Sequence, residues 1–149
     1  MKVFLGGTCN NSTWREELKP MLDIDYFDPV VKDWTPECMA EEIKQREECD
    51  FCLYVITPKM MGVYSIAEVV DDSNKRPGKT IFCFLEREMW SDELFTPGQL
   101  KSLNQVGKMV VDNGGTWLSE LKDVARYLNI KHYDQQNYTE AVLAAGRFL

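Results

Sequence analysis

The chain has 149 residues, the usual length of one domain, and we expect residues 1–149 to form a single domain. Its 24 acidic residues outnumber 17 basic ones, and the resulting net charge of -7 argues against binding to nucleic acid or to an anionic membrane. Hydrophobic residues make up 44% and aromatic residues 11%, which excludes a disordered chain and favours a packed globule with a small-molecule or protein partner.

Five short apolar runs, taken in chain order, are rich in β-branched and aromatic residues and predict strands. The third run, FCLYVIT, is almost continuously apolar, as expected of a central parallel strand that is covered on both faces. The predicted strands are residues 2–5, 24–27, 51–57, 79–85 and 108–111.

Amphipathic segments between and after these strands predict helices. Thr35 followed by Pro36 is the clearest start, because a threonine caps helices and a proline is preset for the first helical position. Ser12 and Thr116 are expected to cap helices in the same way. Residues 86–105 are expected to be irregular or briefly helical. The predicted helices are residues 12–22, 36–48, 62–74, 116–128 and 138–148.

This alternation predicts an α/β domain with a mainly parallel five-stranded sheet. Right-handed crossovers between parallel strands place helices on both faces of such a sheet. Ligands bind these folds at the carboxyl ends of the strands. The expected site is therefore formed by the loops that begin near residues 6, 28, 58 and 86.

Glu68 is a single carboxylate in an otherwise apolar stretch just beyond the third predicted strand. Partial burial raises the pKa of a carboxyl group, so Glu68 could be a tuned nucleophile or proton donor. Ser65 and Glu68 also fit an S-x-x-E capping box, in which both side chains bond backbone N–H groups at a helix start. The residues alone leave both interpretations open.

The first apolar run is too short for a signal peptide, and no segment approaches the roughly 20 apolar residues of a membrane span, so we expect a cytoplasmic protein. The five cysteines are odd in number and scattered, which argues against a disulfide framework and favours reduced thiols. Cys49 and Cys52 form a C-x-x-C, which suits a redox pair or half a zinc site. The alternative is two structural cysteines, and the only histidine, His132, is far away in sequence.

Three motifs occur in order: FLGGT at residues 4–8, CDFCLYVITP at residues 49–58 and GVYSIAE at residues 62–68. Together they resemble the nucleoside 2-deoxyribosyltransferase-like family. The resemblance covers about residues 1–85. The order and spacing of the three motifs carry it, rather than any one of them.

The resemblance implies a flavodoxin-like or Rossmann-like three-layer fold, and cleavage or transfer at the N-glycosidic bond of a 2-deoxynucleoside or 2-deoxynucleotide. It implies that Glu68 attacks the anomeric carbon while the base leaves, which divides the displacement into two easier steps. The family also has an acid eight residues before the aspartate that starts the third strand. Here that acid is Glu42, where the family usually has Asp, and it would assist Glu68 unless it is a water-exposed helix acid. No metal or organic cofactor is implied.

Two positions depart from the family's pattern. Phe4 stands where the family often has a tyrosine that hydrogen-bonds the nucleophile. Gly62 stands where transferases tend to carry Asp and nucleotide-hydrolysing relatives carry Ser. Nucleoside and nucleotide substrates, and transfer and hydrolysis, therefore stay open. Ser65 and the backbone N–H groups at the helix start could hold a phosphate.

The other candidates for substrate binding lie in the predicted loops and the helix starts after them. Trp34, Tyr64 and Trp90 could stack on a base or serve only in packing. The full set of binding candidates is Phe4, Gly6, Gly7, Asp28, Trp34, Gly62, Tyr64 and Ser65.

Two other functions stay open. Phe4 and Gly62 replace polar groups, as in a catalytically silent nucleotide-binding or interaction module. A glycohydrolase acting on a dinucleotide such as NAD would also use a carboxylate near a helix start. The resemblance further implies a homo-oligomer in which a neighbouring subunit helps to close each site, through residues 90–105 or 130–149. The expected partner is a small nucleoside or nucleotide, without nucleic acid or membrane.

Overall fold

A parallel sheet forms the centre of the computed structural model, which describes residues 1–9 and 11–146. Within those residues the sheet has five strands in the order β2-β1-β3-β4-β5, which is the order of flavodoxin-like folds. The predicted fold class is therefore confirmed. The strands are β1 (Lys2–Gly7), β2 (Asp25–Phe27), β3 (Phe51–Ile56), β4 (Thr80–Phe84) and β5 (Thr116–Leu118).

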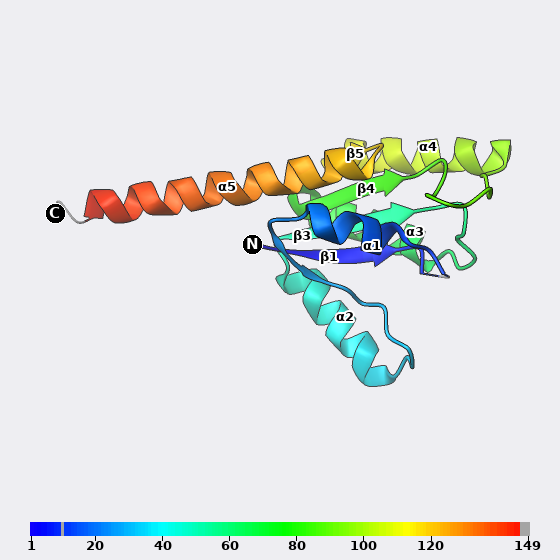
Figure 1. The fold of residues 1–149 in the computed structure, drawn as a ribbon, viewed down its shortest axis with the longest axis horizontal. Helices are drawn as coiled ribbons and strands as arrows, with labels where there is room; N and C mark the ends of the chain where they lie inside the picture. The colour runs from blue at the N-terminus through cyan, green and yellow to red at the C-terminus, as the bar shows by residue number, and fades with distance from the viewer. Residues whose placement is uncertain (10, 147–149) are drawn as a thin grey trace.

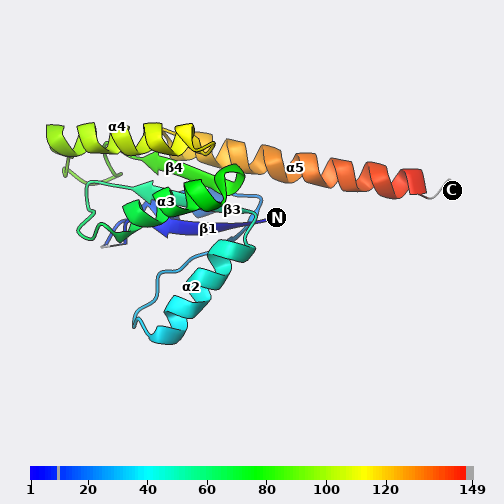
Figure 2. The ribbon, with the colours of Figure 1, turned by 180° about the vertical axis from the view of Figure 1, so that it is seen from behind.

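Helices cover both faces of the sheet and complete a three-layer arrangement (Figure 1). They are α1 (Trp14–Leu18), η1 (Lys19–Met21), α2 (Pro36–Glu48), α3 (Tyr64–Lys75), η2 (Pro77–Lys79), α4 (Pro97–Asp112) and α5 (Leu121–Gly146). Trp14 of α1 and Leu128 of α5 are buried against one face. Val69 of α3 and Val110 of α4 are buried against the opposite face of the sheet. Figure 2 shows the molecule from behind, with α3 in front of the strands. In Figure 1, α2 is angled away from the sheet and approaches it only at its C-terminal end.

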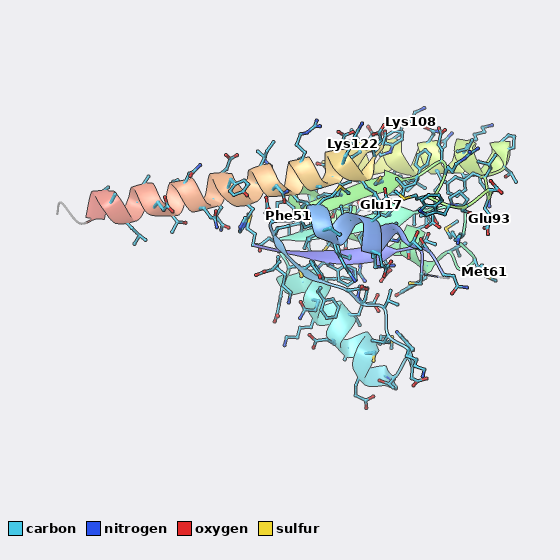
Figure 3. The ribbon with its side chains drawn as sticks, viewed as in Figure 1. Glu17, Phe51, Met61, Glu93, Lys108 and Lys122 are labelled. Atoms are coloured by element: carbon cyan, nitrogen blue, oxygen red, sulfur yellow. The ribbon has the colours of Figure 1, made fainter. Side chains whose placement is uncertain are left out.

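β3 is the central strand, as its apolar run predicts. All of its residues are buried, and it pairs with β1 on one side and β4 on the other. Phe51 begins β3, whereas Met61 and Glu93 lie in the loops beyond the opposite, carboxyl end of the strands (Figure 3). The loops expected to carry a site therefore meet at one end of the sheet.

The predicted strand at residues 108–111 is wrong, because these residues belong to α4. Thr96 and Gln99 form a full capping box at the start of this helix, with Pro97 in the first helical position. Val110 is buried against the sheet as part of a helical stripe. The strong start signals and this periodicity outweigh the local strand preference of two adjacent valines.

β5 occupies the start of the segment that was predicted as a helix from Thr116, so that helix start is also wrong. The strand is three residues long, too short for a pattern of alternation to be recognised. Trp117 fixes it to the sheet, because its ring lies 6.4 Å from that of Phe82 and 6.1 Å from that of Phe84.

α5 is longer than the sequence predicts. It runs from Leu121 through residues 130–137, which were expected to precede a separate helix. The end of that predicted helix, residues 147 and 148, lies outside the described residues. In Figure 1, α5 leaves the sheet and extends far beyond the amino ends of the strands. In the part of the chain that the structure describes, no helix has the length and apolar content needed to cross a membrane.

Two predicted helix caps have opposite outcomes. Thr35 caps α2, since its hydroxyl oxygen accepts from the N–H of Cys38 at 3.3 Å, which confirms that prediction. Ser12 does not cap α1, whose N-cap position is occupied by Thr13. The Ser12 hydroxyl instead donates to a carboxylate oxygen of Glu88 in the loop after β4.

Candidate functional site

A cavity of about 580 Å³ opens where β1 ends, between α2 and α3. The loop after β2 forms a further wall. This position at the carboxyl ends of parallel strands is where ligands bind in such folds. The lining residues are Gly6, Gly7, Cys9, Arg15, Pro29, Val30, Val31, Trp34, Met39, Glu42, Ile43, Arg46, Tyr64, Ser65 and Glu68.

Most of the residues predicted for the site line this one cavity. They come from β1, the loop after β2, α2 and α3, which are separated in sequence and meet only in the folded chain. The predicted residues that the structure brings together are Gly6, Gly7, Trp34, Glu42, Tyr64, Ser65 and Glu68.

Phe4, Asp28 and Gly62 are not among the residues that line the cavity. Phe4 is fully buried in the core. Asp28 pairs with Arg15 at 3.4 Å and with Lys19 at 2.6 Å, so its carboxylate is already engaged. Gly62 borders open space, because a Cβ atom there would meet nothing within 4 Å. The loop at Gly62 therefore supplies no side chain to the cavity.

Gly6 and Gly7 are required by the close approach of β1 to β3. Gly7 has φ +119°, and a Cβ atom there would lie 2.0 Å from the carbonyl oxygen of Val55. A Cβ atom on Gly6 would lie 2.7 Å from the ring of Tyr54. Bare backbone therefore forms the wall of the cavity beside the carboxyl groups described next.

Glu68 projects from α3 and is only 7% exposed. Its Oε1 lies 3.3 Å from Nη1 of Arg46. Burial raises the pKa of Glu68 to about 7, with Glu42 and Asp72 adding to the rise and Arg46 opposing it. Glu68 thus exchanges its proton near neutral pH, which suits a reacting carboxyl group.

Ser65 does not form the predicted capping box. α3 begins at Tyr64 with Val63 in the N-cap position, and the Val63 side chain makes no cap hydrogen bond. Ser65 is the second residue of the helix and lines the cavity. The capping interpretation of Glu68 is therefore wrong, and its carboxyl group is held by Arg46 instead.

Glu42 lines the cavity from α2 and is half-buried. Burial raises its pKa, while the charge of Arg46 and smaller interactions with Glu68 and Trp34 oppose the rise. Glu42 and Glu68 shift each other's pKa, so the two carboxyl groups titrate as a coupled pair.

The sequence reasoning missed the buried ion network behind this pair. Arg46 binds Asp72 through Nη2 at 2.8 Å, and Asp72 also accepts from the hydroxyl of Tyr54. Spacing could have indicated both charged residues. Arg46 follows Glu42 by four positions, and Asp72 follows Glu68 by four, so each pair lies on one helix face.

Two aromatic side chains stand at the mouth of the cavity. Trp34 is 60% exposed and Tyr64 is 73% exposed, and both line the opening. Neither is needed to fill the core, so both remain available to a planar ligand. Trp90 is almost fully exposed and is not among the lining residues, so it takes no part in this cavity.

The C-x-x-C cysteines are structural. Cys49 follows α2 and Cys52 lies in β3, both buried with unpaired thiols, and burial raises the pKa of the Cys52 thiol to about 12. Among residues 1–9 and 11–146, no group of three or more His, Cys, Asp and Glu side chains could hold a metal ion.

The fold and the cavity together define an α/β protein of flavodoxin-like topology with a carboxyl pair at the strand ends. The family model described as nucleoside 2-deoxyribosyltransferase like matches residues 1–87, and the chain belongs to this family. The matched range contains all the residues that line the cavity. No curated relative matches the sequence.

Proposed function

We propose that this protein cleaves or transfers at the N-glycosidic bond of a 2-deoxynucleoside or 2-deoxynucleotide, with Glu68 as the nucleophile. The observation that carries the proposal is the pair of a buried Glu68 and a half-buried Glu42 in one cavity at the strand ends of a chain in this family. An ionised Glu68 would attack C1′ of the sugar, and a protonated Glu42 would give its proton to the departing base. This chemistry needs no metal or organic cofactor.

The charges around the cavity support a neutral 5′ group on the sugar. Both guanidinium groups that line it are already engaged, Arg15 by main-chain carbonyl groups and Asp28, and Arg46 by Asp72 and Glu68. A 5′-phosphate would have to compete with these partners and would meet nearby carboxylates. A deoxynucleoside is therefore the favoured substrate, with its base against the exposed aromatic side chains at the mouth.

The test is incubation with deoxynucleosides, their 5′-monophosphates and NAD, each with and without an added free base, followed by chromatography. Base release or exchange from a deoxynucleoside supports the proposal. Binding without turnover across the panel favours a catalytically silent nucleotide-binding module. The buried Phe4 and the lack of a side chain at Gly62 are consistent with that alternative. Release of nicotinamide would identify the dinucleotide glycohydrolase.

The pH dependence of the reaction should follow the carboxyl pair. Because Glu68 must be ionised to attack and burial raises its pKa to about 7, kcat/KM should fall about tenfold per pH unit below that value. Glu42→Gln removes a charge that raises the pKa of Glu68, so the acid limb of the variant should move to lower pH. A pH–rate profile of both proteins decides this, and an unchanged limb in the variant would contradict the coupling.

We also propose that the protein is a homo-oligomer joined by the projecting part of α5. This segment exposes Tyr138, Val142 and Leu143, and its residues 141–146 carry no charge. Two chains of net charge -7 would meet most easily at such an uncharged surface. An isolated helical segment is also marginally stable in water, so a second copy would stabilise it.

Light scattering should give a mass above the 17.3 kDa of one chain. Tyr138→Glu combined with Val142→Glu should reduce the mass to a monomer, since charge would be buried in the contact. The matched double variant Gln136→Glu and Thr139→Glu adds the same charge to the same exposed helix. Equal dissociation in both double variants would rule out the apolar contact, as would a monomeric parent protein.

A further inference from the structure

Arg46 of α2 lies between two carboxyl groups of α3. Its Nε lies 3.2 Å from Oδ2 of Asp72 and its Nη2 lies 2.8 Å from Oδ1, which makes a two-point ion pair. Its remaining nitrogen, Nη1, lies 3.3 Å from Oε1 of Glu68. Because the guanidinium group is planar, the pair with Asp72 fixes the direction in which Nη1 donates to Glu68.

The anchor of this arrangement is Asp72, which is fully buried. It also accepts hydrogen bonds from the hydroxyl of Tyr54 and the guanidinium of Arg76. Burial alone would raise the pKa of Asp72, but the hydrogen bonds from Arg46 and Tyr54 lower it below its ordinary value. Burial would lower the pKa of Arg46, yet its bond to Asp72 raises it. The pair therefore stays ionised while Glu68 titrates.

We infer that Arg46, anchored by Asp72, is a positioning residue that acts through Glu68 and assists the expulsion of its carboxylate in the second half of the reaction. The inference rests on the proposed function, because it concerns the covalent glycosyl intermediate of that reaction. Asp72 acts one step further back, by holding Arg46 in place.

The charge on Glu68 changes in opposite directions in the two steps. In the first, a Glu68 oxygen forms a bond to C1′, the C1′–N bond breaks, and its electron pair leaves with the base, which takes a proton from Glu42. In the second, water or an acceptor base forms a bond to C1′ and gives a proton to Glu42. As that bond forms, the C1′–O bond to Glu68 breaks and its electron pair returns to the Glu68 carboxylate.

Negative charge thus disappears from Glu68 in the first step and returns in the second. A hydrogen-bond donor fixed at Oε1 stabilises the carboxylate as it is released. The same donor makes Glu68 a weaker nucleophile in the first step. Removing Arg46 should therefore slow the second step selectively, whereas a merely structural role would impair both steps together.

Several charged groups affect the pKa of Glu68, and their effects must be distinguished from that of Arg46 in any titration. Glu42 faces it from α2, and Asp72 acts from its own helix. Asp71 lies 3.5 Å from Nη2 of Arg46. Arg15 of α1 acts on Glu42. Among these, Arg46 is the cation that opposes protonation of Glu68, so its loss should raise the titration midpoint.

The test compares Arg46→Met and Arg46→Lys with the parent protein. In Arg46→Met the carboxyl carbon signal of Glu68 should titrate about one pH unit higher or more, as measured by NMR. At the pH where each protein releases base fastest in a single turnover, base should still be released rapidly in the first turnover, while steady-state turnover falls about a hundredfold. A deoxyribosyl adduct should then accumulate in the intact mass spectrum. Arg46→Lys should behave similarly, because one ammonium group does not span both carboxylates.

Lys75→Met is the matched control. It removes a cation from an exposed ion pair with Asp71 on the same helix as Glu68, and neither the midpoint nor the two rates should change. If the Arg46 variants do not fold, the parent protein still decides the point: the guanidinium nitrogen signals of Arg46 must shift with the midpoint of Glu68.

The outcomes separate the two proposals. Absence of base release by the parent protein overturns the proposed function and with it the two-step role. Base release by the parent protein, combined with equal losses in both steps of the Arg46 variants, overturns the role of Arg46 alone. Guanidinium nitrogen signals of Arg46 that do not shift as Glu68 titrates also overturn the role of Arg46.

Discussion

Glu68→Gln is expected to lower base release by about a thousandfold or more while the fold is retained. The amide oxygen of glutamine can still accept the hydrogen bond that Arg46 donates to Oε1, so the cavity keeps its shape. The amide is no longer a carboxylate nucleophile and cannot form the ester with C1′. Chromatographic measurement of base release by the purified variant gives the rate.

The same variant should be more stable than the parent protein above about pH 7. Folding raises the pKa of Glu68 from 4.5 to about 7, so the folded state binds this proton more tightly than the unfolded state. Its stabilising effect is complete below pH 4.5 and is lost as the pH rises to about 7. The loss amounts to about 3 kcal/mol, and the neutral glutamine avoids it. Denaturant unfolding at several pH values measures the difference.

Loss of activity together with a gain in stability would show that the variant lacks the nucleophile and is not misfolded, because a misfolded protein cannot gain stability. Glu47→Gln is the matched control, since it removes the same charge from an exposed position on α2. It should change neither activity nor stability by more than about 0.5 kcal/mol. Retention of most activity by Glu68→Gln would contradict the assignment of the nucleophile.

The part of the site that the sequence predicts is the part encoded by local order. A central apolar strand, a following helix and a carboxylate at its start specify where Glu68 must lie, because strand ends of a parallel sheet meet at one edge. The glycine pair at residues 6 and 7 follows β1 for the same reason, and Thr35 with Pro36 fixes the start of α2. Each of these signals spans a few residues and needs no knowledge of tertiary contacts.

The remainder depends on contacts between segments that are distant in sequence. Residues 108–111 have strand-like side chains, yet they lie in a helix because Val110 packs across the sheet as part of a stripe. In the sequence, Arg46 is one of several charged residues on an acidic helix. Only the folded structure shows that it pairs with Asp72 of another helix. The Arg46–Asp72 pair differs from the surrounding surface charges in being buried, and burial is a property of the folded chain.

Asp72→Asn is expected to lower the free energy of unfolding by about 3 kcal/mol or more. The substitution keeps the shape of the side chain and removes the charge that pairs with the buried Arg46 and the partly buried Arg76. Arg46 would keep only its longer contacts to Glu68 and Asp71, and Arg76 would lose its ion-pair partner. The cost of these weakly compensated charges exceeds that of one lost hydrogen bond. Denaturant unfolding near neutral pH measures the loss.

Asp71→Asn provides the comparison, because it removes the same charge one position earlier on α3. Asp71 is 45% exposed and pairs mainly with the exposed Lys75, so its loss should cost less than about 1 kcal/mol.

The two variants should also differ in their pH dependence. The pKa of Asp72 is lowered in the folded state, so the stability that it contributes is present above its unfolded pKa and is lost as the pH falls. The gap between the parent protein and Asp72→Asn should therefore narrow on acidification. Equal losses in the two aspartate variants would show that the network is screened by solvent, and Arg46 would then have no firm anchor from which to act on Glu68.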